Sequence, residues 1–229
     1  MAIRQKKNFK YLDIITGVFV AVLLISDISD TKAITIGFLS FGGGTFLFPI
    51  AYIFGDILTE VYGFKRARRI IWIGFACSAL MAIMFTLVGM APPSPDYPYQ
   101  KDFMHILGMT PRIAIASLTA YFFGEFVNSV TLAKMKIFTK GRFLWTRTIG
   151  STVVGELVDT SIFMFIGFFG VFPLSLILSI IISGYFLKVI TEVVFTPVTY
   201  WVVTFLKRKE HEDYYDRKTK FTPFEITVE

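Results

Sequence analysis

The sequence is poor in the residues that build disulfides, metal centres and nucleophilic sites. It contains a single cysteine, Cys77, which lies in an apolar run, so no intrachain disulfide can form. Its two histidines, His105 and His211, have no partners at metal-binding spacing, so we expect neither a metal nor another cofactor. The sequence also lacks a glycine-rich phosphate loop, a zinc signature and a nucleophile motif, which argues against an enzyme.

Apolar residues, by contrast, are abundant and form long runs. Hydrophobic residues make up 54% and aromatic residues 17% of the 229 residues, and the mean hydropathy is +0.63. A helix needs roughly 20 apolar residues to cross about 30 Å of hydrocarbon. Runs of this kind fill most of the chain and leave no room for a second, soluble domain. We therefore predict an all-α integral membrane protein with six transmembrane helices over residues 11–26, 45–62, 70–90, 113–133, 148–171 and 174–206.

This pattern divides the chain into an arm over residues 1–10, a transmembrane transport domain over 11–206 and a charged tail over 207–229. The start of the chain mimics a secretory signal peptide, but no small-x-small cleavage site follows its apolar run, so we expect a retained first helix. The apolar stretch at 33–44 is too short to span and ends in three glycines, which predicts a re-entrant or extended loop. The charged tail is expected to be partly disordered.

The basic residues indicate the orientation, because positively charged loops stay on the cytoplasmic side of a membrane. With six crossings, nearly all of the 23 lysines and arginines fall on the side of the two termini. The other side holds only Lys32, Lys101 and Arg112, and Lys188 lies inside the last predicted helix. We therefore predict a multi-pass protein of the cell membrane (inner or plasma membrane) with cytoplasmic N- and C-termini.

Ionisable residues also occur well inside the predicted spans. Each costs about 3 kcal/mol at the centre of an inserting helix, so seven would cost roughly 20 kcal/mol. At about 1.5 Å of rise per residue, all the acids except Glu60 fall in one layer roughly 10–22 Å from the cytoplasmic boundary. Glu60 lies nearer to that boundary. Groups of this kind persist when they face a shared polar interior, and the set is Asp56, Glu60, Glu125, Glu156, Asp159, Lys188 and Glu192.

A short pattern of glycine, acid, two apolar and two polar residues occurs three times, beginning at Gly55, Gly124 and Gly155. In a helix the acid and the two polar positions share one face. The glycine beside them lets a neighbouring helix approach closely. The pattern therefore adds Asn128 to the candidate residues and predicts that these faces meet.

Two structural alternatives remain open for these residues. Polar side chains can hold membrane helices together without binding any ligand. In addition, Lys188 and Glu192 stand at i and i+4 of one predicted helix, where they could form a structural ion pair with each other.

Residues 48–63, with the sequence FPIAYIFGDILTEVYG, and residues 66–72, with the sequence RARRIIW, resemble the signature of the queuosine precursor transporter family, also known as the vitamin uptake transporter family. Further matches lie at residues 111–114, 116–117, 155–161, 185–188 and 197. The resemblance implies import of a 7-deazaguanine such as preQ0, preQ1 or queuine. It also implies a fold similar to the substrate-binding subunits of energy-coupling-factor vitamin transporters. The family pattern commonly has glutamine at positions 125 and 156, where this chain has glutamate.

The candidate residues suit such a ligand. A guanine-like ring carries an N1–H and an exocyclic amine side by side, and a carboxylate can accept hydrogen bonds from both. Lys188, Asn128 or Arg112 could donate to the ring carbonyl oxygen. Because six carboxylates and one lysine cannot all stay charged in low dielectric, we hypothesise proton coupling. The expected substrate-binding residues are Asp56, Glu60, Glu125, Asn128, Glu156, Asp159, Lys188, Glu192 and Arg112.

We expect a secondary importer that contacts a small molecule and the lipid bilayer but no nucleic acid, and a homodimer is compatible with so small a transporter. One alternative is a substrate-binding subunit that needs a separate permease and ATPase, for which Gly17 and Ala21 offer a small-residue docking face. A second is a transporter of another vitamin-like heterocycle. A third, an intramembrane enzyme with paired acids, lacks a nucleophile or metal set.

Overall fold

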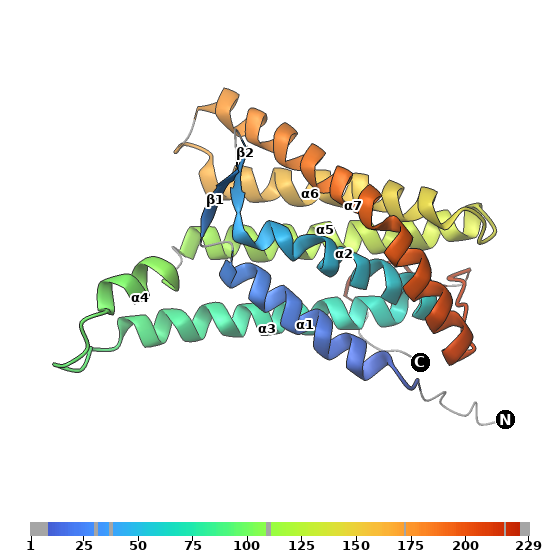
Figure 1. Cartoon of the computed structure of the whole chain (residues 1–229), viewed down its shortest axis with the longest axis horizontal. Helices are drawn as coiled ribbons and strands as arrows, with labels where there is room; N and C mark the ends of the chain where they lie inside the picture. The colour runs from blue at the N-terminus through green and yellow to red at the C-terminus, as the bar shows by residue number, and fades with distance from the viewer. Residues whose placement is uncertain are drawn as a thin grey trace.

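The structure, a computed structural model, describes residues 9–29, 32–36, 39–108, 111–171, 173–217 and 219–224. Long helices lie side by side along the molecule, and one short hairpin packs among them (Figure 1). Short helical turns flank α2, a 3-10 turn over Gly43–Phe46 before it and a π-helix over Leu58–Tyr62 after it. The elements are α1 Leu12–Ser29, β1 Ala33–Ile36, β2 Leu39–Gly42, α2 Phe48–Ile57, α3 Phe64–Met90, α4 Gln100–Ile106, α5 Pro111–Phe138, α6 Leu144–Phe168 and α7 Leu174–Glu210.

The described helices agree with the predicted membrane segments in position, but not all of them meet the requirements for a span. Four are long and apolar enough to cross a membrane: α1, α3, α6 and the Ile180–Glu210 part of α7. The segment predicted at 45–62 is shorter than expected, because its α-helix has only 10 residues between the 3-10 turn and the π-helix. Helix α5 has 28 residues but carries many polar side chains.

Large apolar side chains on the outside of these helices are consistent with lipid contact. Leu80 and Leu87 on α3 are exposed, and so are Val194 and Trp201 on α7. A water-soluble protein rarely exposes large contiguous apolar surfaces. The long apolar helices and this outer surface together define a multi-pass membrane protein.

Of the two conformations predicted for the stretch at 33–44, a re-entrant or an extended loop, the structure shows the extended one. Strands β1 and β2 pair antiparallel, with Ala33 opposite Gly42 and Ile36 opposite Leu39. The N–H of Gly43 donates to the carbonyl oxygen of Lys32 and closes the hairpin at 2.8 Å. Such pairing satisfies backbone groups that would be costly to leave free in a nonpolar environment.

Gly63 produces the sharp change of direction between the π-helix and α3. Its φ is +85°, a conformation that glycine adopts without the strain of a Cβ. Helix α3 then begins at Phe64, six residues before the predicted start at residue 70. The basic residues in this first part are stabilised by carbonyl oxygens, as when Arg66 donates to that of Tyr62 at 2.8 Å. The sequence pattern missed this turn because a charged helix end looks like a loop.

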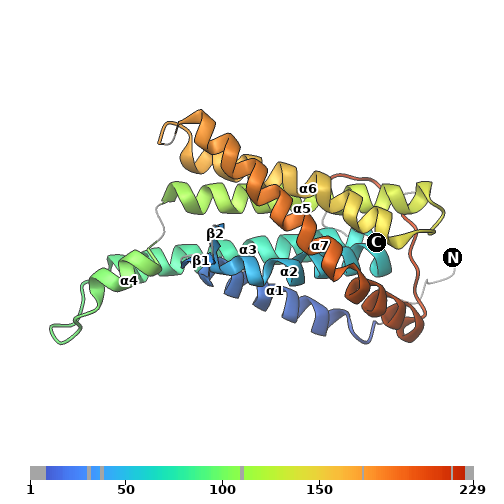
Figure 2. The same cartoon turned by 45° about the horizontal axis from the view of Figure 1, so that its top comes forward.

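The start of α1 and the end of α7 meet at one end of the molecule, here called the basic end because Arg68, Lys136, Arg147 and Lys207 lie there. Glu210 accepts hydrogen bonds from the backbone N–H groups of Lys10 and Tyr11 at 3.0 and 2.7 Å. After Glu210 the chain folds back beside the helices instead of projecting away (Figure 2). The described part of the tail, residues 211–217 and 219–224, is therefore ordered by contacts that the sequence composition did not reveal.

Candidate functional site

The acids, amide and lysine inside the helices come together in one polar layer. It draws on four elements, because α2 contributes Asp56, α5 contributes Glu125 and Asn128, and α6 and α7 contribute two residues each. Apart from Asp159, the acids and the amide are at most 3% exposed. We call this group the acidic layer; its members are Asp56, Glu125, Asn128, Glu156, Asp159, Lys188 and Glu192.

The three repeated glycines bring the helices of the acidic layer into close contact, as the sequence pattern predicted. A Cβ on Gly124 of α5 would lie 2.7 Å from Cβ of Asp159 on α6. A Cβ on Gly155 of α6 would lie 2.8 Å from Cβ of Asn128, and one on Gly55 of α2 would lie 2.9 Å from Oε2 of Glu125. Each glycine thus makes room for a polar residue of the layer on a neighbouring helix.

Asp56 connects α2 to the rest of the layer. Its Oδ1 accepts a hydrogen bond from Nδ2 of Asn128 at 3.0 Å. The carboxylates of Glu192 and Glu125 are close enough to Asp56 for electrostatic repulsion. A second bridge, from the π-helix to α5, joins the hydroxyl groups of Thr59 and Ser129 at 3.1 Å. The layer therefore concentrates acidic side chains where α2, α5 and α7 meet.

Lys188 supplies the positive charge of the layer. Its Nζ lies 2.7 Å from Oε2 of Glu156 and 3.1 Å from Oδ2 of Asp159, both on α6. It also donates to Oγ1 of Thr160 at 3.3 Å. The alternative of an intrahelical pair between Lys188 and Glu192 does not describe these contacts, because the lysine reaches across to α6.

Several buried acceptor atoms of the layer have no hydrogen-bond partner within the described protein. They are Asp56 Oδ2, Glu125 Oε2, Asn128 Oδ1 and both carboxylate oxygens of Glu192. Buried polar atoms are nearly always paired, so a group of orphaned acceptors in one place calls for an explanation. Donor groups of a bound molecule would supply one.

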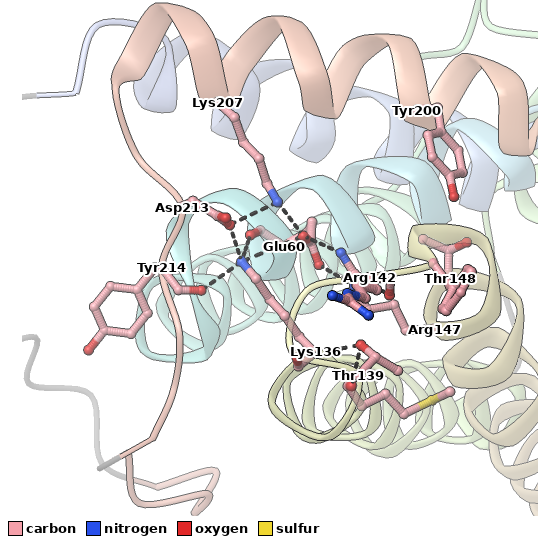
Figure 3. Close-up of polar contacts among 12 residues, drawn as sticks. Glu60, Lys136, Thr139, Arg142, Arg147, Thr148, Tyr200, Lys207, Asp213 and Tyr214 are labelled. Carbon is pink, nitrogen blue, oxygen red and sulfur yellow. Dashed lines mark hydrogen bonds and ion pairs between the residues drawn. The ribbon is translucent and has the colours of Figure 1, made fainter.

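Glu60 lies one helical turn from Asp56 but belongs to a separate ion cluster (Figure 3). Its two carboxylate oxygens accept a bidentate contact from Arg147, at 2.7 Å for each nitrogen. Nζ of Lys207 donates to Oε1 of the same carboxylate at 2.5 Å, and Nζ of Lys136 lies 3.5 Å from this oxygen. Its charge is already matched by cations, so Glu60 is not placed to serve the acidic layer.

Arg112 is likewise placed away from the acidic layer. Its side chain is exposed and donates to the carbonyl oxygens of Ile166 and Phe169 at 2.6 and 2.5 Å, at the end of α6. An arginine near the last carbonyl groups stabilises a helix C-terminus, and this role accounts for its position.

Some polar residues near the layer were not predicted from the sequence. Thr152 is buried one turn before Glu156 on α6, and its Oγ1 has no hydrogen-bond partner within the described protein. The i−4 spacing from Glu156 was the signal that could have identified it. Lys136 and Arg147 belong to the basic residues that the sequence places on the side of the two termini, and only the fold shows that both are buried.

The buried layer inside apolar helices is the arrangement of a membrane transporter. Intramembrane ionisable residues typically mark the path of a substrate or ion. The chain belongs to the family described as "Putative vitamin uptake transporter", whose sequence profile matches residues 42–202. The match includes the whole acidic layer and ends before Lys207. The chain is thus a multi-pass membrane transporter and not an enzyme.

Individual relatives carry more specific names. A "Probable queuosine precursor transporter" of Bacillus subtilis (strain 168) is 35% identical over 161 residues, which is 69% of each chain. The "Queuosine precursor transporter" of Escherichia coli (strain K12) is 25% identical over 163 residues, 70% of this chain and 71% of that protein. A "Probable queuosine precursor transporter" of Haemophilus influenzae is 22% identical over 126 residues, 55% of this chain and 51% of the relative. No solved structure matches the chain.

Proposed function

We propose that the protein imports a queuosine precursor, a 7-deazaguanine, and that the acidic layer is its substrate site. The names of the relatives support this substrate class. The observation that carries the site is the group of orphaned acceptor atoms on Asp56, Glu125, Asn128 and Glu192. All of them accept hydrogen bonds, so they favour a ligand that presents several donors.

A guanine-like ring presents such donors along one edge. Its N1–H and exocyclic amine can both bind one carboxylate, and a charged acceptor strengthens each contact. Glu192 offers two unpaired oxygens for this contact, and Asp56 and Glu125 each offer one. Lys188 stands on the α6 side of the layer with its three N–H donors directed at Glu156, Asp159 and Thr160, so a ring carbonyl oxygen would replace one of these partners, such as the weakly bound Thr160 hydroxyl group. Glu60 and Arg112 are left out of this site, because their own partners occupy them.

The proposed orientation places the basic end in the cytoplasm. Arg68, Lys136, Arg147 and Lys207 lie at this end, and positive charge is retained on the cytoplasmic side. With α2 and α5 crossing beside the four apolar helices, the chain would make six crossings and return its terminus to the cytoplasm. At about 1.5 Å per residue, the 28 residues of α5 extend about 42 Å, which is enough to cross.

We propose a secondary transporter that works without a partner ATPase. The rival arrangement is a binding subunit docked on a separate permease, and one feature favours it. Gly17 on α1 has no atoms of the described protein within 4 Å of a built Cβ, so this face is open to a partner helix.

Uptake by the purified protein in liposomes separates these possibilities. Labelled precursor should accumulate inside vesicles that contain this chain alone, and a pH gradient should change the rate if protons are coupled. Excess guanine, preQ0, preQ1 and queuine, added one at a time, would rank the substrates by competition. A purified protein that binds a precursor but never transports it would support the binding-subunit alternative. A protein that neither binds nor transports any of them would refute the substrate assignment.

A further inference from the structure

The buried ammonium group of Lys136 links the tail to the helices at the basic end. A lysine ammonium group has three N–H donors. They bind the backbone carbonyl oxygen of Glu60 at 2.5 Å, Oδ1 of Asp213 at 2.6 Å and the carbonyl oxygen of Tyr214 at 2.7 Å. Lys136 is only 2% exposed, and two of its three acceptors come from the tail (Figure 3). Without the tail, a buried cation would lose most of its hydrogen bonds.

Asp213 also joins α7 to this contact. Its Oδ1 lies 2.8 Å from Nζ of Lys207, which in turn binds Glu60. Glu60 holds Arg147 of α6 in the bidentate contact described above. One connected set of ion pairs therefore joins the π-helix, α5, α6, α7 and the tail.

Two glycines provide independent support for a fitted tail. Gly63 and Gly141, with φ of +85° and +77°, stand at the turns before α3 and α6. A Cβ at position 63 would collide with the ring of Tyr214, and one at position 141 would collide with the hydroxyl group of Tyr215. Both turns thus lack the side chain that would prevent the tail from docking.

The tail is also attached to the beginning of α3. Asp216 accepts a hydrogen bond from the N–H of Phe64 at 2.9 Å and so caps this helix. Arg68 donates to the carbonyl oxygen of Thr222 at 2.6 Å, and Trp72 donates to that of Pro223 at 2.7 Å. The tail therefore runs from the ion cluster to α3 and bridges elements on both sides of the basic end.

We propose that the ion cluster of Glu60, Lys136, Arg147, Lys207 and Asp213 is the gate at the basic end, and that tail residues 213–217 and 219–223 are its latch. A transporter must open its site to each side in turn, which requires one group of helices to move against another. Opening this end separates α5, α6 and α7, and so it must break ion pairs of the cluster. The docked tail opposes that step. Glu60 is then a gate residue that lies one helical turn from Asp56 of the acidic layer.

Access to Thr152 tests the gate, because this buried residue lies on α6 between Arg147 and Glu156. The reporter is Thr152→Cys in a chain that carries Cys77→Ser, probed with a membrane-impermeant thiol reagent from the cytoplasmic side. Asp213→Ala removes the tail carboxylate that Lys136 and Lys207 share, and Asp216→Ala removes the acceptor of the Phe64 N–H at the start of α3. Asp96→Ala, at an exposed acid far along the chain, is the matched control.

In both latch variants the cysteine of Thr152→Cys should be labelled about tenfold faster than with the unaltered latch, as expected when the closed state is destabilised by ~1.4 kcal/mol. In the Asp96→Ala control it should be labelled at the original rate. Unchanged labelling in folded latch variants would overturn the gate, and so would faster labelling only from the opposite side. The inference rests on the proposed orientation, but its readout needs no substrate. If the unaltered protein takes up precursor but the latch variants label at the original rate, the gate alone is refuted. If the latch variants label faster but the unaltered protein takes up no precursor, the substrate assignment alone is refuted.

Hydrogen exchange of the unaltered protein provides a second measurement that needs no variant to fold. The N–H of Tyr214 donates to the carbonyl oxygen of Val61 at 3.3 Å, so its protection reports docking of the latch. Under transport conditions with a precursor on one side only, exchange over residues 213–216 should become faster than without precursor. Transport at full rate with no change in exchange over this segment would overturn the latch.

Discussion

Lys188 on α7 and Glu156 on α6 form an ion pair of 2.7 Å between Nζ and Oε2, inside the group of helices and one turn away from Glu192 on the lysine's own helix. The lysine thus pairs with the acidic side chains of α6. The Glu192 carboxylate is left without a hydrogen-bond partner in the described protein. The division gives the acidic layer two different parts. One is an ion pair between α6 and α7, and the other is a set of acceptors that a ligand can use.

Replacing Lys188 should eliminate transport. Lys188→Ala leaves the buried Glu156 without its cation, and removing one partner of a buried pair typically costs about 3–5 kcal/mol. We expect uptake per inserted protein to fall at least about 100-fold, while Lys188→Arg retains part of it. Lys101→Ala, an exposed lysine, is the control and should transport normally. Normal uptake by Lys188→Ala would remove the lysine from the site.

Adding a methyl group at the repeated glycines should separate the helices of the acidic layer. Gly124→Ala places Cβ 2.7 Å from Cβ of Asp159, and overpacking of this kind typically costs about 1–3 kcal/mol. Gly184→Ala is the matched control because a Cβ there would meet no atom of another described element within 4 Å, so it should stabilise α7 by about 0.4–1 kcal/mol. Thermal unfolding of the purified variants measures both. Equal effects at the two positions would contradict the close approach of α5 and α6.

Arg147→Lys should destabilise the protein without weakening substrate binding. Lysine cannot reproduce the bidentate contact to Glu60, and hydrogen bonds between charged groups contribute about 1.5–3 kcal/mol. The unfolding temperature should fall, and precursor affinity of the folded protein should stay the same. A large loss of precursor affinity would instead show that Glu60 and its partners belong to the substrate site.

The tail contact should lose strength in acid. Burial raises the pKa of the Asp213 carboxyl group, but hydrogen bonds from Lys136 and Lys207 outweigh burial, so this pKa lies below its usual value. A carboxyl group whose pKa is lower in the folded state stabilises the fold at every pH above its unfolded-state pKa of about 3.9. That stabilisation is lost as the pH falls through the folded-state value. The difference in unfolding temperature between the unaltered protein and Asp213→Asn should therefore be full at neutral pH and disappear in acid. A difference that grows as the pH falls would contradict the assigned contacts.

Much of the fold and of the acidic layer could be predicted because both depend on local patterns. The apolar runs place the helices, and the i, i+3, i+4 spacing after Gly55, Gly124 and Gly155 places polar groups on one face. These patterns hold whatever the detailed packing, so the sequence alone was enough.

The remaining features depend on long-range contacts that no local pattern encodes. Glu60 looked like a site acid because its cations, Lys136, Arg147 and Lys207, come from three distant helices. Lys188 had an equally suitable partner on its own helix, and only the packing of α6 on α7 decides between them. The tail has a composition typical of disorder, yet its carbonyl oxygens and aspartates bind helix ends more than 70 residues away in sequence.

The most direct test of the substrate site is the affinity of the purified protein for a labelled queuosine precursor in matched glutamate variants of α7. Glu192 has two orphaned oxygens in the acidic layer, whereas Glu210 binds backbone N–H groups at the basic end. We predict that Glu192→Gln raises the Kd about 10-fold or more, as expected for the loss of charge-assisted hydrogen bonds, and that Glu210→Gln leaves it unchanged. Equal and undiminished affinity in both variants would contradict the assignment of the acidic layer as the binding site.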